Sequence, residues 1–339
     1  MNDLRSMYLD ELSEYMKQIG EPAFRAKQVY EWLHKKYAAT ADDMTNISKS
    51  LREKIRGDIV TLVEETRLTS KDDGTIKFLY RLSDGQMIET VFMRYHHGNS
   101  LCISSQAGCR MGCDFCASGI GGLIRNLTAS EMLEQVYASM RLTGERISNI
   151  VVMGTGEALD NYDNFIRFLD LITDEKGYNL SERSITVSSC GLVPMIRKLA
   201  QAGRTVTLAL SLHASTDETR RKIMPIARSY TLAETLDACS YYFEKTGRRV
   251  TFEYALIHGV NDNEEEAMRL SKLIHGMNCH VNLIPVNPVM EKGYTRGSRD
   301  EIDAFKKILE KNQINVTIRR GVGRDIDAAC GQLRRRYSL

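Results

Sequence analysis

Three cysteines lie within eight consecutive residues of this chain. Cys109, Cys113 and Cys116 form a C-x3-C-x2-C pattern, which supplies three thiolates to one small volume. A structural zinc site uses four protein ligands and is usually built from C-x2-C pairs. Three thiolates on a cubane of four irons would instead leave one iron free to bind a substrate. The spacing therefore predicts a 4Fe-4S cluster with an open iron; a zinc loop completed by a ligand elsewhere, or three incidental thiols, are the alternatives.

Strand-like and helix-like stretches alternate from residue 101 onward, which predicts a parallel β/α sheet partly closed into a barrel. The strands are expected at 101–105, 149–153, 184–188, 206–212, 250–256, 280–285 and 315–319. Helices, several opened by Ser, Thr, Asp or Asn caps, are expected at 128–142, 163–173, 232–245, 263–274 and 299–309. The cysteine loop follows the first strand, so we expect it at the C-terminal mouth, where such barrels keep their active sites.

The first 94 residues differ from this pattern. Residues 1–60 are predicted to be a small helical domain, with apolar positions at helical spacing from Leu4 to Met16, a second helix after Pro22 and a third near Ser48. Residues 61–94 alternate and contain two turn signals, so a short antiparallel β linker sheet is expected there. Residues 95–339 are then the α/β core, a partial barrel of about six β/α units.

Composition indicates an ordinary globular chain of 339 residues, with 42% hydrophobic and 27% charged residues and no apolar run near 18 residues. Eight cysteines are too sparse for a secreted disulfide scaffold, which favours a cytoplasmic protein with no membrane partner. Net charge is only +2, but residues 291–339 carry 12 Lys and Arg against 7 Asp and Glu. This basic tail is by itself weak evidence for RNA binding.

Polar residues follow several of the predicted strands. Gly156 and Glu157 end the segment after 149–153, where glycines allow close approach and the carboxylate offers an acceptor for an ammonium group. Further polar or strand-end residues are Ser188, Ser211, Leu212, His213 and Asn287. Each alone is a common turn or cap residue, but together they outline one polar pocket at the strand ends.

The cysteine spacing, with Phe115 before the last cysteine, resembles that of the radical S-adenosylmethionine (SAM) superfamily. The resemblance implies that the free iron binds the amino and carboxylate groups of SAM, and that the polar pocket at the strand ends holds its ribose, carboxylate and adenine. One electron from the cluster then cleaves SAM to methionine and a 5′-deoxyadenosyl radical. The superfamily fold, a partial (β/α)6 barrel, agrees with the predicted strands.

The resemblance to one family extends over nearly the whole chain. The stretches 20–28, 44–46, 104–109, 125–128, 283–287 and 325–333 are similar to those of the RlmN family. That family methylates C2 of adenosine in 23S rRNA and in certain tRNAs. The resemblance implies one 4Fe-4S cluster, two SAM molecules per turnover, both RNAs as partners, an electron donor such as flavodoxin or ferredoxin, and a monomer.

The same resemblance implies roles for three further residues. Cys330 would carry a methyl group as S-methylcysteine and form a transient bond to RNA, and Cys102 would resolve that adduct by forming a disulfide with Cys330. Glu89 would accept the C2 proton. Residue patterns alone favour simpler interpretations: the two cysteines as small buried residues, and Glu89 as a surface-facing residue of its strand.

Two departures from the family keep alternatives open. Ala158 stands where RlmN-type chains usually have proline, and alanine occurs there in the Cfr relatives, which methylate C8 of adenosine; Cys190 replaces a small non-thiol residue. Methylation at C8 is therefore the nearest alternative. An alternative of another class is a non-catalytic iron-sulfur RNA-binding assembly factor, and a third is a radical enzyme acting on a small molecule.

Overall fold

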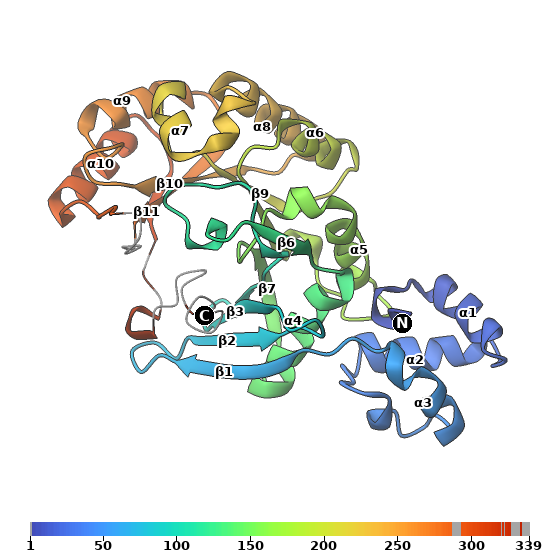
Figure 1. Cartoon of the computed structure of the whole chain (residues 1–339). Coiled ribbons are helices and arrows are strands. Elements are labelled where there is room, and N and C mark those ends of the chain that lie inside the picture. Colours follow the sequence, from blue (N-terminus) through green and yellow to red (C-terminus); the bar gives the residue numbers. More distant parts are fainter. Residues whose placement is uncertain (1, 287–292, 320, 322, 327–332, 334–339) are drawn as a thin grey trace.

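One curved sheet forms the centre of the protein (Figure 1). The computed structural model describes residues 2–286, 293–319, 321, 323–326 and 333. In this part of the chain the sheet has ten strands, in the order β1-β2-β3-β4-β7-β8-β9-β10-β11-β12. Their bounds are β1 Val63–Thr69, β2 Ile76–Arg81, β3 Met87–Met93, β4 Asn99–Cys102, β7 Ile147–Val152, β8 Ile185–Ser189, β9 Thr207–Ser211, β10 Val250–Leu256, β11 Cys279–Pro285 and β12 Val316–Ile318.

The strands from β4 to β12 are parallel, as expected for β/α units. The sheet does not close on itself in the described residues, because β1 and β12 are its two edges. The predicted α/β partial barrel is thus confirmed, and β10 has the predicted bounds. The first barrel strand is shorter than expected: β4 ends at Cys102, and β5 (Gln106–Gly108) pairs instead with β6 (Leu123–Asn126) in a separate hairpin.

The antiparallel strands are present, but they do not form a sheet of their own. β1 pairs with β2, β2 with β3, and β3 with β4, so the three strands extend the barrel sheet beyond β4. The register sets Val91 opposite Cys102. Pairing satisfies the backbone groups that an unpaired edge of β4 would expose, which is the physical reason for the continuity.

Helices cover the outer face of this sheet (Figure 1). They are α4 Ala129–Thr143, α5 Tyr162–Thr173, α6 Val193–Gln201, α7 Asp217–Ile223, α8 Leu232–Thr246, α9 Glu264–Leu273 and α10 Arg299–Lys311. Thr128, Thr231 and Ser298 start three of them with capping boxes, and Gly144 and Gly247 end two in the left-handed conformation. None of the helices in the described part of the chain combines the length and apolar character that a bilayer crossing requires.

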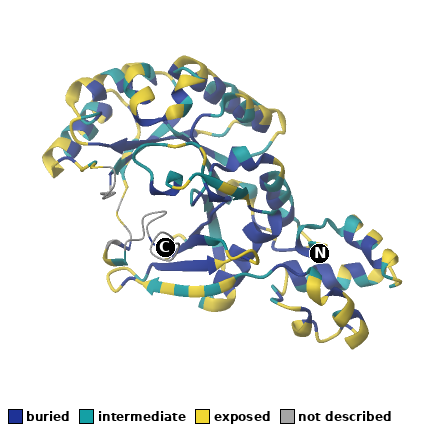
Figure 2. Cartoon of the chain, viewed as in Figure 1, coloured by how far each residue is buried: buried dark blue, intermediate teal, exposed yellow. Residues whose placement is uncertain are grey.

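Alternating residues divide the strands between two faces. Leu101, Ile150 and Val187 pack into the hydrophobic core beneath the helices. Their neighbours Cys102, Val151 and Ser188 therefore point to the opposite, inner face of the sheet, as do Ser211, Glu253 and Asn282. Figure 2 shows the buried strands between helices whose outer sides are exposed. The inner face is the polar one, which suits it to hold a polar ligand.

The amino-terminal helices share this core. They are α1 Leu9–Gln18, α2 Phe24–His34 and α3 Lys49–Ile55, and their apolar side chains join the same contiguous cluster as α4 and α5. The helical spacing that starts at Leu4 is interrupted, because Met7 and Tyr8 are extended between a short 3-10 turn and α1. The backbone amide of Tyr8 donates to Glu11 Oε2 at 2.8 Å, which caps the new helix start.

A buried ion pair joins the amino-terminal segment to α4. Arg5 pairs with Glu134, and both side chains are 0% exposed. Arg5 Nη2 also donates to the carbonyl of Ala38 at 2.9 Å, and Arg141 contacts the same carboxylate from the rim. Burial lowers the pKa of Arg5, and Glu134 opposes that effect. Removing one partner of such a pair leaves an uncompensated charge inside the protein.

We expect Arg5→Met to reduce the free energy of unfolding by about 3 kcal/mol, because Glu134 would lose its only fully buried cation while keeping Arg141. The control is Arg56→Met, which removes an exposed pair with Asp42 and should cost less than about 1 kcal/mol. Urea denaturation of both variants measures the difference. Equal losses of free energy of unfolding in the two variants would show that the buried pair stabilises the protein no more than the exposed pair does.

A second prediction concerns the stability of the protein at acidic pH. His34 is fully buried, and burial together with the charge of Arg5 lowers its pKa to about 3. In the unfolded chain it would titrate near 6.5, so below that pH only the unfolded state takes up the proton and stability falls. Between pH 7 and 5.5 the wild type should lose about 1 kcal/mol more than His34→Phe. Denaturation at both pH values measures this, with His275→Asn at an exposed position expected to behave as wild type.

Candidate active site

The three cysteines lie in the connection between β5 and β6. The amide of Cys109 donates to the carbonyl of Gly122 at 2.9 Å, which closes the base of the loop. Gly108 has a φ of +84°, and a Cβ placed on it would lie 2.1 Å from that same carbonyl oxygen. Only glycine permits this approach. Farther along the loop, the amide of Asp114 donates to the carbonyl of Ile223 at 2.8 Å, which fastens the loop to the end of α7.

The three thiols lie in one partly buried loop. Cys109, Cys113 and Cys116 are all of intermediate exposure. A structural zinc ion takes four protein ligands, whereas three thiolates suit a cubane of four irons that keeps one iron open. The donor set therefore fits a 4Fe-4S cluster. Burial raises the pKa of the Cys109 thiol to about 11.

A glycine segment after β7 packs against the root of the cysteine hairpin. A Cβ on Gly154 would lie 2.7 Å from the carbonyl oxygen of Ile103, and one on Gly156 would lie 2.6 Å from Gln106 Cβ. The amides of Ser105 and Gln106 both donate to the carbonyl of Thr155, at 2.9 and 3.1 Å. This close backbone contact brings the predicted SAM-binding segment next to the cysteine loop.

Glu157 is held by amides from two directions. Its side chain is buried, Oε2 accepts from the amide of Cys190 at 2.7 Å, and Oε1 accepts from the amide of Leu159 at 3.2 Å. Burial raises the pKa of Glu157, and the hydrogen bonds from Cys190 act against that shift. The side chains of Cys190 and Ser189 add to these bonds, so the carboxylate is fixed in position by donors of its own chain.

Two of the polar strand-end residues lie side by side in the structure. Ser188 Oγ and Ser211 Oγ are 3.5 Å apart on the inner face. His213 Nδ1 accepts from the amide of Ala255 at 2.8 Å, and its buried ring, whose pKa burial lowers to about 3, meets Phe115 edge-on at 4.7 Å. The side chain of Leu212 instead lies in the hydrophobic core, so only its backbone borders the site. Asn287 lies outside the described residues.

Glu89 and Cys102 share the inner face of the sheet. Val91 is opposite Cys102, and Glu89 is two residues from Val91 on the same strand, so Glu89 and Cys102 are diagonal neighbours. Glu89 is 3% exposed. The expectation from residue patterns that it faces solvent is therefore wrong, because the curved sheet encloses this face. Cys102 is buried with Val91, Met93 and their neighbours in a small apolar cluster.

Lys77 is a residue of this site that sequence reasoning missed. It is 0% exposed in β2, and its Nζ lies 3.1 Å from Glu89 Oε2. The sequence feature that could have revealed Lys77 is the turn at Asp84 and Gly85. This turn pairs Leu79 with Glu89, so that Lys77 is a diagonal cross-strand neighbour of Glu89. A lysine inside an apolar strand then has a carboxylate partner rather than solvent.

Cys330 lies outside the described residues, but part of the tail that contains it is anchored. The amide of Gly323 donates to Asp73 Oδ2, and that of Lys71 donates to Asp325 Oδ2, both at 2.9 Å. These bonds fix the start of the tail to the turn between β1 and β2 (Figure 1). Burial opposes ionisation of Asp73, but the hydrogen bonds from Gly323, Thr75 and Ser70 together lower its pKa to about 2.

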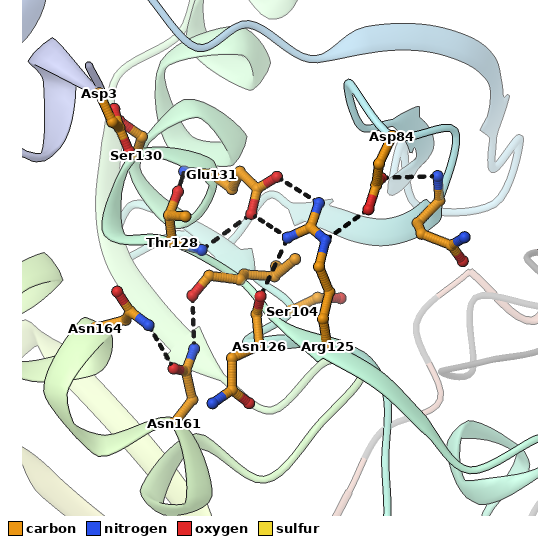
Figure 3. A network of polar contacts seen from close by, with 12 residues as sticks. Asp3, Asp84, Ser104, Arg125, Asn126, Thr128, Ser130, Glu131, Asn161 and Asn164 are labelled. Carbon is orange, nitrogen blue, oxygen red and sulfur yellow. Dashed lines mark hydrogen bonds and ion pairs between the residues drawn. The ribbon is translucent and has the colours of Figure 1, made fainter. Parts of the chain in front are cut away.

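Arg125 of β6 holds the cysteine hairpin in place (Figure 3). Its Nε donates to Asp84 Oδ2 at 2.6 Å, and its Nη1 and Nη2 donate to the two carboxylate oxygens of Glu131, each at 2.8 Å. The bonds to Glu131 and Asp84 raise the pKa of Arg125, so its charge is secure. Asn161 adds to the same network, since its Nδ2 donates to the carbonyl of Ser105 at 2.9 Å. The hairpin is thus tied to α4 and to the turn between β2 and β3.

The loop geometry yields a test. Gly108→Ala should prevent closure of the loop, because the added Cβ meets the Gly122 carbonyl, and anaerobic reconstitution should then load far less iron than in the wild type. Gly121→Ala is the matched control: it has a similar positive φ of +91° but open space around it, and should cost only about 1 kcal/mol while retaining iron. Iron and sulfide analysis measures both. Equal loading of the two variants would contradict the role of the close contact.

Comparison with known proteins agrees with this architecture. The radical SAM superfamily model matches residues 103–271, and the model described as the ribosomal RNA large subunit methyltransferase N-terminal domain matches residues 2–60. A solved radical SAM methyltransferase from Sphaerobacter thermophilus superposes with a TM-score of 0.94 at 43% identity, covering 98% of this chain and 99% of that one.

Two curated relatives are similar over almost their full length. Both are described as probable dual-specificity RNA methyltransferase RlmN. The protein of Lachnoclostridium phytofermentans is 58% identical over 338 residues, which cover 99% of this chain and 95% of the relative. That of Clostridium perfringens is 52% identical over 339 residues, covering 99% and 98%. With this identity over the whole length, the chain belongs to the RlmN family of radical SAM methyltransferases.

Proposed function

We propose that this protein methylates C2 of adenosine in 23S rRNA and in tRNA. The observation that carries the proposal is the placement of Glu89 and Cys102 on one enclosed face of the sheet. Cys102 is the last residue of β4, and the chain continues from there to Cys109. An aromatic carbon between two ring nitrogens does not attack a SAM methyl group as an ordinary nucleophile does. A route that uses a thiol carrier and a separate proton acceptor matches the residue types assembled here.

Cys109, Cys113 and Cys116 would hold the 4Fe-4S cluster, and Gly156, Glu157, Ser188, Ser211 and His213, with the backbone of Leu212 and with Asn287, would hold SAM. When bound, these groups would supply the methyl group and the one-electron chemistry that initiates its transfer. Glu157 would accept from the SAM ammonium. His213 stays neutral near pH 7, since burial lowers its pKa to about 3, so it would act as a hydrogen-bonding and packing group rather than as a cation.

Three residues would handle the RNA base. Cys330 would carry the methyl group and become linked to C2, and Glu89 would take the C2 proton. The thiolate of Cys102 would then attack the sulfur of Cys330. The S–S bond would form as the bond between Cys330 sulfur and the methylene carbon breaks, and that carbon would take up a proton to become the methyl group of the released base. Lys77, at 3.1 Å from Glu89, orients that carboxylate and balances its charge within the enclosed face.

The remaining expectations extend this proposal. Residues 1–60 would form an RNA-facing helical domain, 61–94 the β extension and 95–339 the catalytic core, and the match of residues 2–60 to a methyltransferase N-terminal domain supports the first. Each turnover would consume two SAM molecules and electrons from a donor of the flavodoxin or ferredoxin type. We expect a monomer acting in the cytoplasm.

Product analysis tests the proposal directly. The reconstituted enzyme with reductant, SAM and a 23S rRNA fragment or tRNA should yield 2-methyladenosine, and mass spectrometry of digested RNA distinguishes it from the 8-methyl product of the Cfr-like alternative that Ala158 keeps open. Cys330→Ala should abolish product, and Cys102→Ala should accumulate a covalent protein–RNA adduct. Cys279→Ala, at the far end of β11, should retain activity. RNA binding without any methylation would favour the assembly-factor alternative.

A further inference from the structure

Arg220 is a buried cation that none of the roles above requires. It lies in α7 and is 0% exposed. Its Nε donates to the carbonyl of Leu212 at 3.1 Å, and its Nη2 donates to the carbonyls of Cys190 at 2.7 Å and Ser211 at 3.2 Å. Its Nη1 is buried and has no hydrogen-bond partner among the residues that the structure describes. All of its bonds are therefore to neutral carbonyls.

No carboxylate among the described residues forms an ion pair with Arg220, and Asp217 acts on it only over a longer distance. The equally buried Arg5 contrasts with it, since Arg5 has Glu134 in direct contact. A guanidinium remains charged in proteins, and an isolated charge in a dry interior is strongly destabilising. An anion must therefore compensate Arg220 in the working protein.

The groups near Arg220 that could carry a negative charge are cysteine thiolates. The guanidinium bonds to the carbonyl of Cys190, and Cys190 and Cys113, when ionised, would raise the pKa of Arg220. Both cysteines belong to one apolar cluster with Ile223, one turn beyond Arg220 on the same helix. The cysteine loop is also bonded to this turn through Asp114 and Ile223. Arg220 thus lies behind the cysteine loop, where the surroundings are apolar and electrostatic interactions are screened little.

The chain makes room for the guanidinium at this place. Gly191 has a φ of +104°, and a Cβ on it would lie 3.1 Å from Arg220 Nη2 and 3.1 Å from Thr235 Cγ2. The same turn presents the Cys190 carbonyl to Arg220 and the Cys190 amide to Glu157. One turn therefore positions both the cation behind the cysteines and the carboxylate proposed to bind SAM.

We propose that Arg220 is the buried counter-charge of the iron-sulfur cluster held by Cys109, Cys113 and Cys116, and that it makes reduction of this cluster easier. The inference rests on the proposed function, because it requires that cluster. Three thiolates give the centre net negative charge, and each added electron increases it. A fixed positive charge nearby opposes that cost through space, so Arg220 is a positioning residue that never contacts the reacting atoms.

The reduction potential measures this effect without any RNA or SAM. In a titration monitored by electron paramagnetic resonance, Arg220→Met should lower the potential by at least the amount equal to a tenfold change in a one-electron equilibrium, about 59 mV. Arg220→Lys should restore most of the shift because it keeps the charge. Arg221→Met is the matched control, since it removes an exposed charge from the adjacent residue and should leave the potential unchanged.

A second measurement separates this electrostatic role from a structural one. If Arg220 acted only through its hydrogen bonds to the carbonyls, its replacement would lower the melting temperature of the cluster-free and the cluster-loaded protein equally. The counter-charge instead predicts that loading raises the melting temperature less in Arg220→Met than in the wild type. Should Arg220→Met fail to fold, Arg220→Gln replaces it as a neutral variant that keeps an amide donor for Cys190.

The outcomes are distinguishable. A wild-type protein that takes up no iron-sulfur cluster overturns the proposed function itself. A loaded wild type whose potential matches that of the neutral variants overturns only the role of Arg220, as does an equal loss of melting temperature with and without the cluster.

Discussion

Close contact between two backbone segments determines where everything else in the site can be. The glycine segment after β7 lies directly on the connection between β4 and β5, and side chains at Gly154 or Gly156 would collide with it. Because that connection leads into the cysteine hairpin, the contact sets the hairpin's position relative to β7 and β8. Glu157, the serines of the inner face and the three thiols are brought together as a consequence. The barrel positions the two segments, and the glycines allow them to approach closely because they have no side chains.

Three Lys and Arg side chains are buried in the described part of the chain, and each has a different kind of partner. Arg5 has a carboxylate in full contact, Lys77 has one at 3.1 Å on the enclosed face, and Arg220 has only carbonyls and thiols. Burial of a charge is costly in proportion to what fails to compensate it. The first cation joins two parts of the fold, the second orients a carboxylate, and the third is balanced only when something negative occupies the cysteine loop. The partner of each buried cation therefore reflects the role of that part of the protein.

Local patterns predicted much of this protein, and long-range pairing accounts for what they missed. The strand and helix periodicities between residues 101 and 319 depend on neighbours in sequence, and the parallel, partly closed α/β sheet that they predicted was confirmed. The cysteine spacing is equally local. Burial of Glu89, in contrast, depends on β3 joining β4 and on the curvature of the whole sheet. Leu212 was assigned to the site by its position beside Ser211, but strand alternation turns its side chain into the core.

The anchoring of the tail at the turn between β1 and β2 has a consequence for engineering. Exposed hairpin tips are normally the safest places to insert a tag or a fused domain. Here the tip is also a docking point, because Lys71 and Asp73 bond to the segment that begins the tail. An insertion at that tip would leave the barrel intact while detaching the segment that leads to Cys330. Fusion sites in this family are better sought on the exposed turns of the outer helices, such as the one after Gly247, where a Cβ would meet nothing within 4 Å.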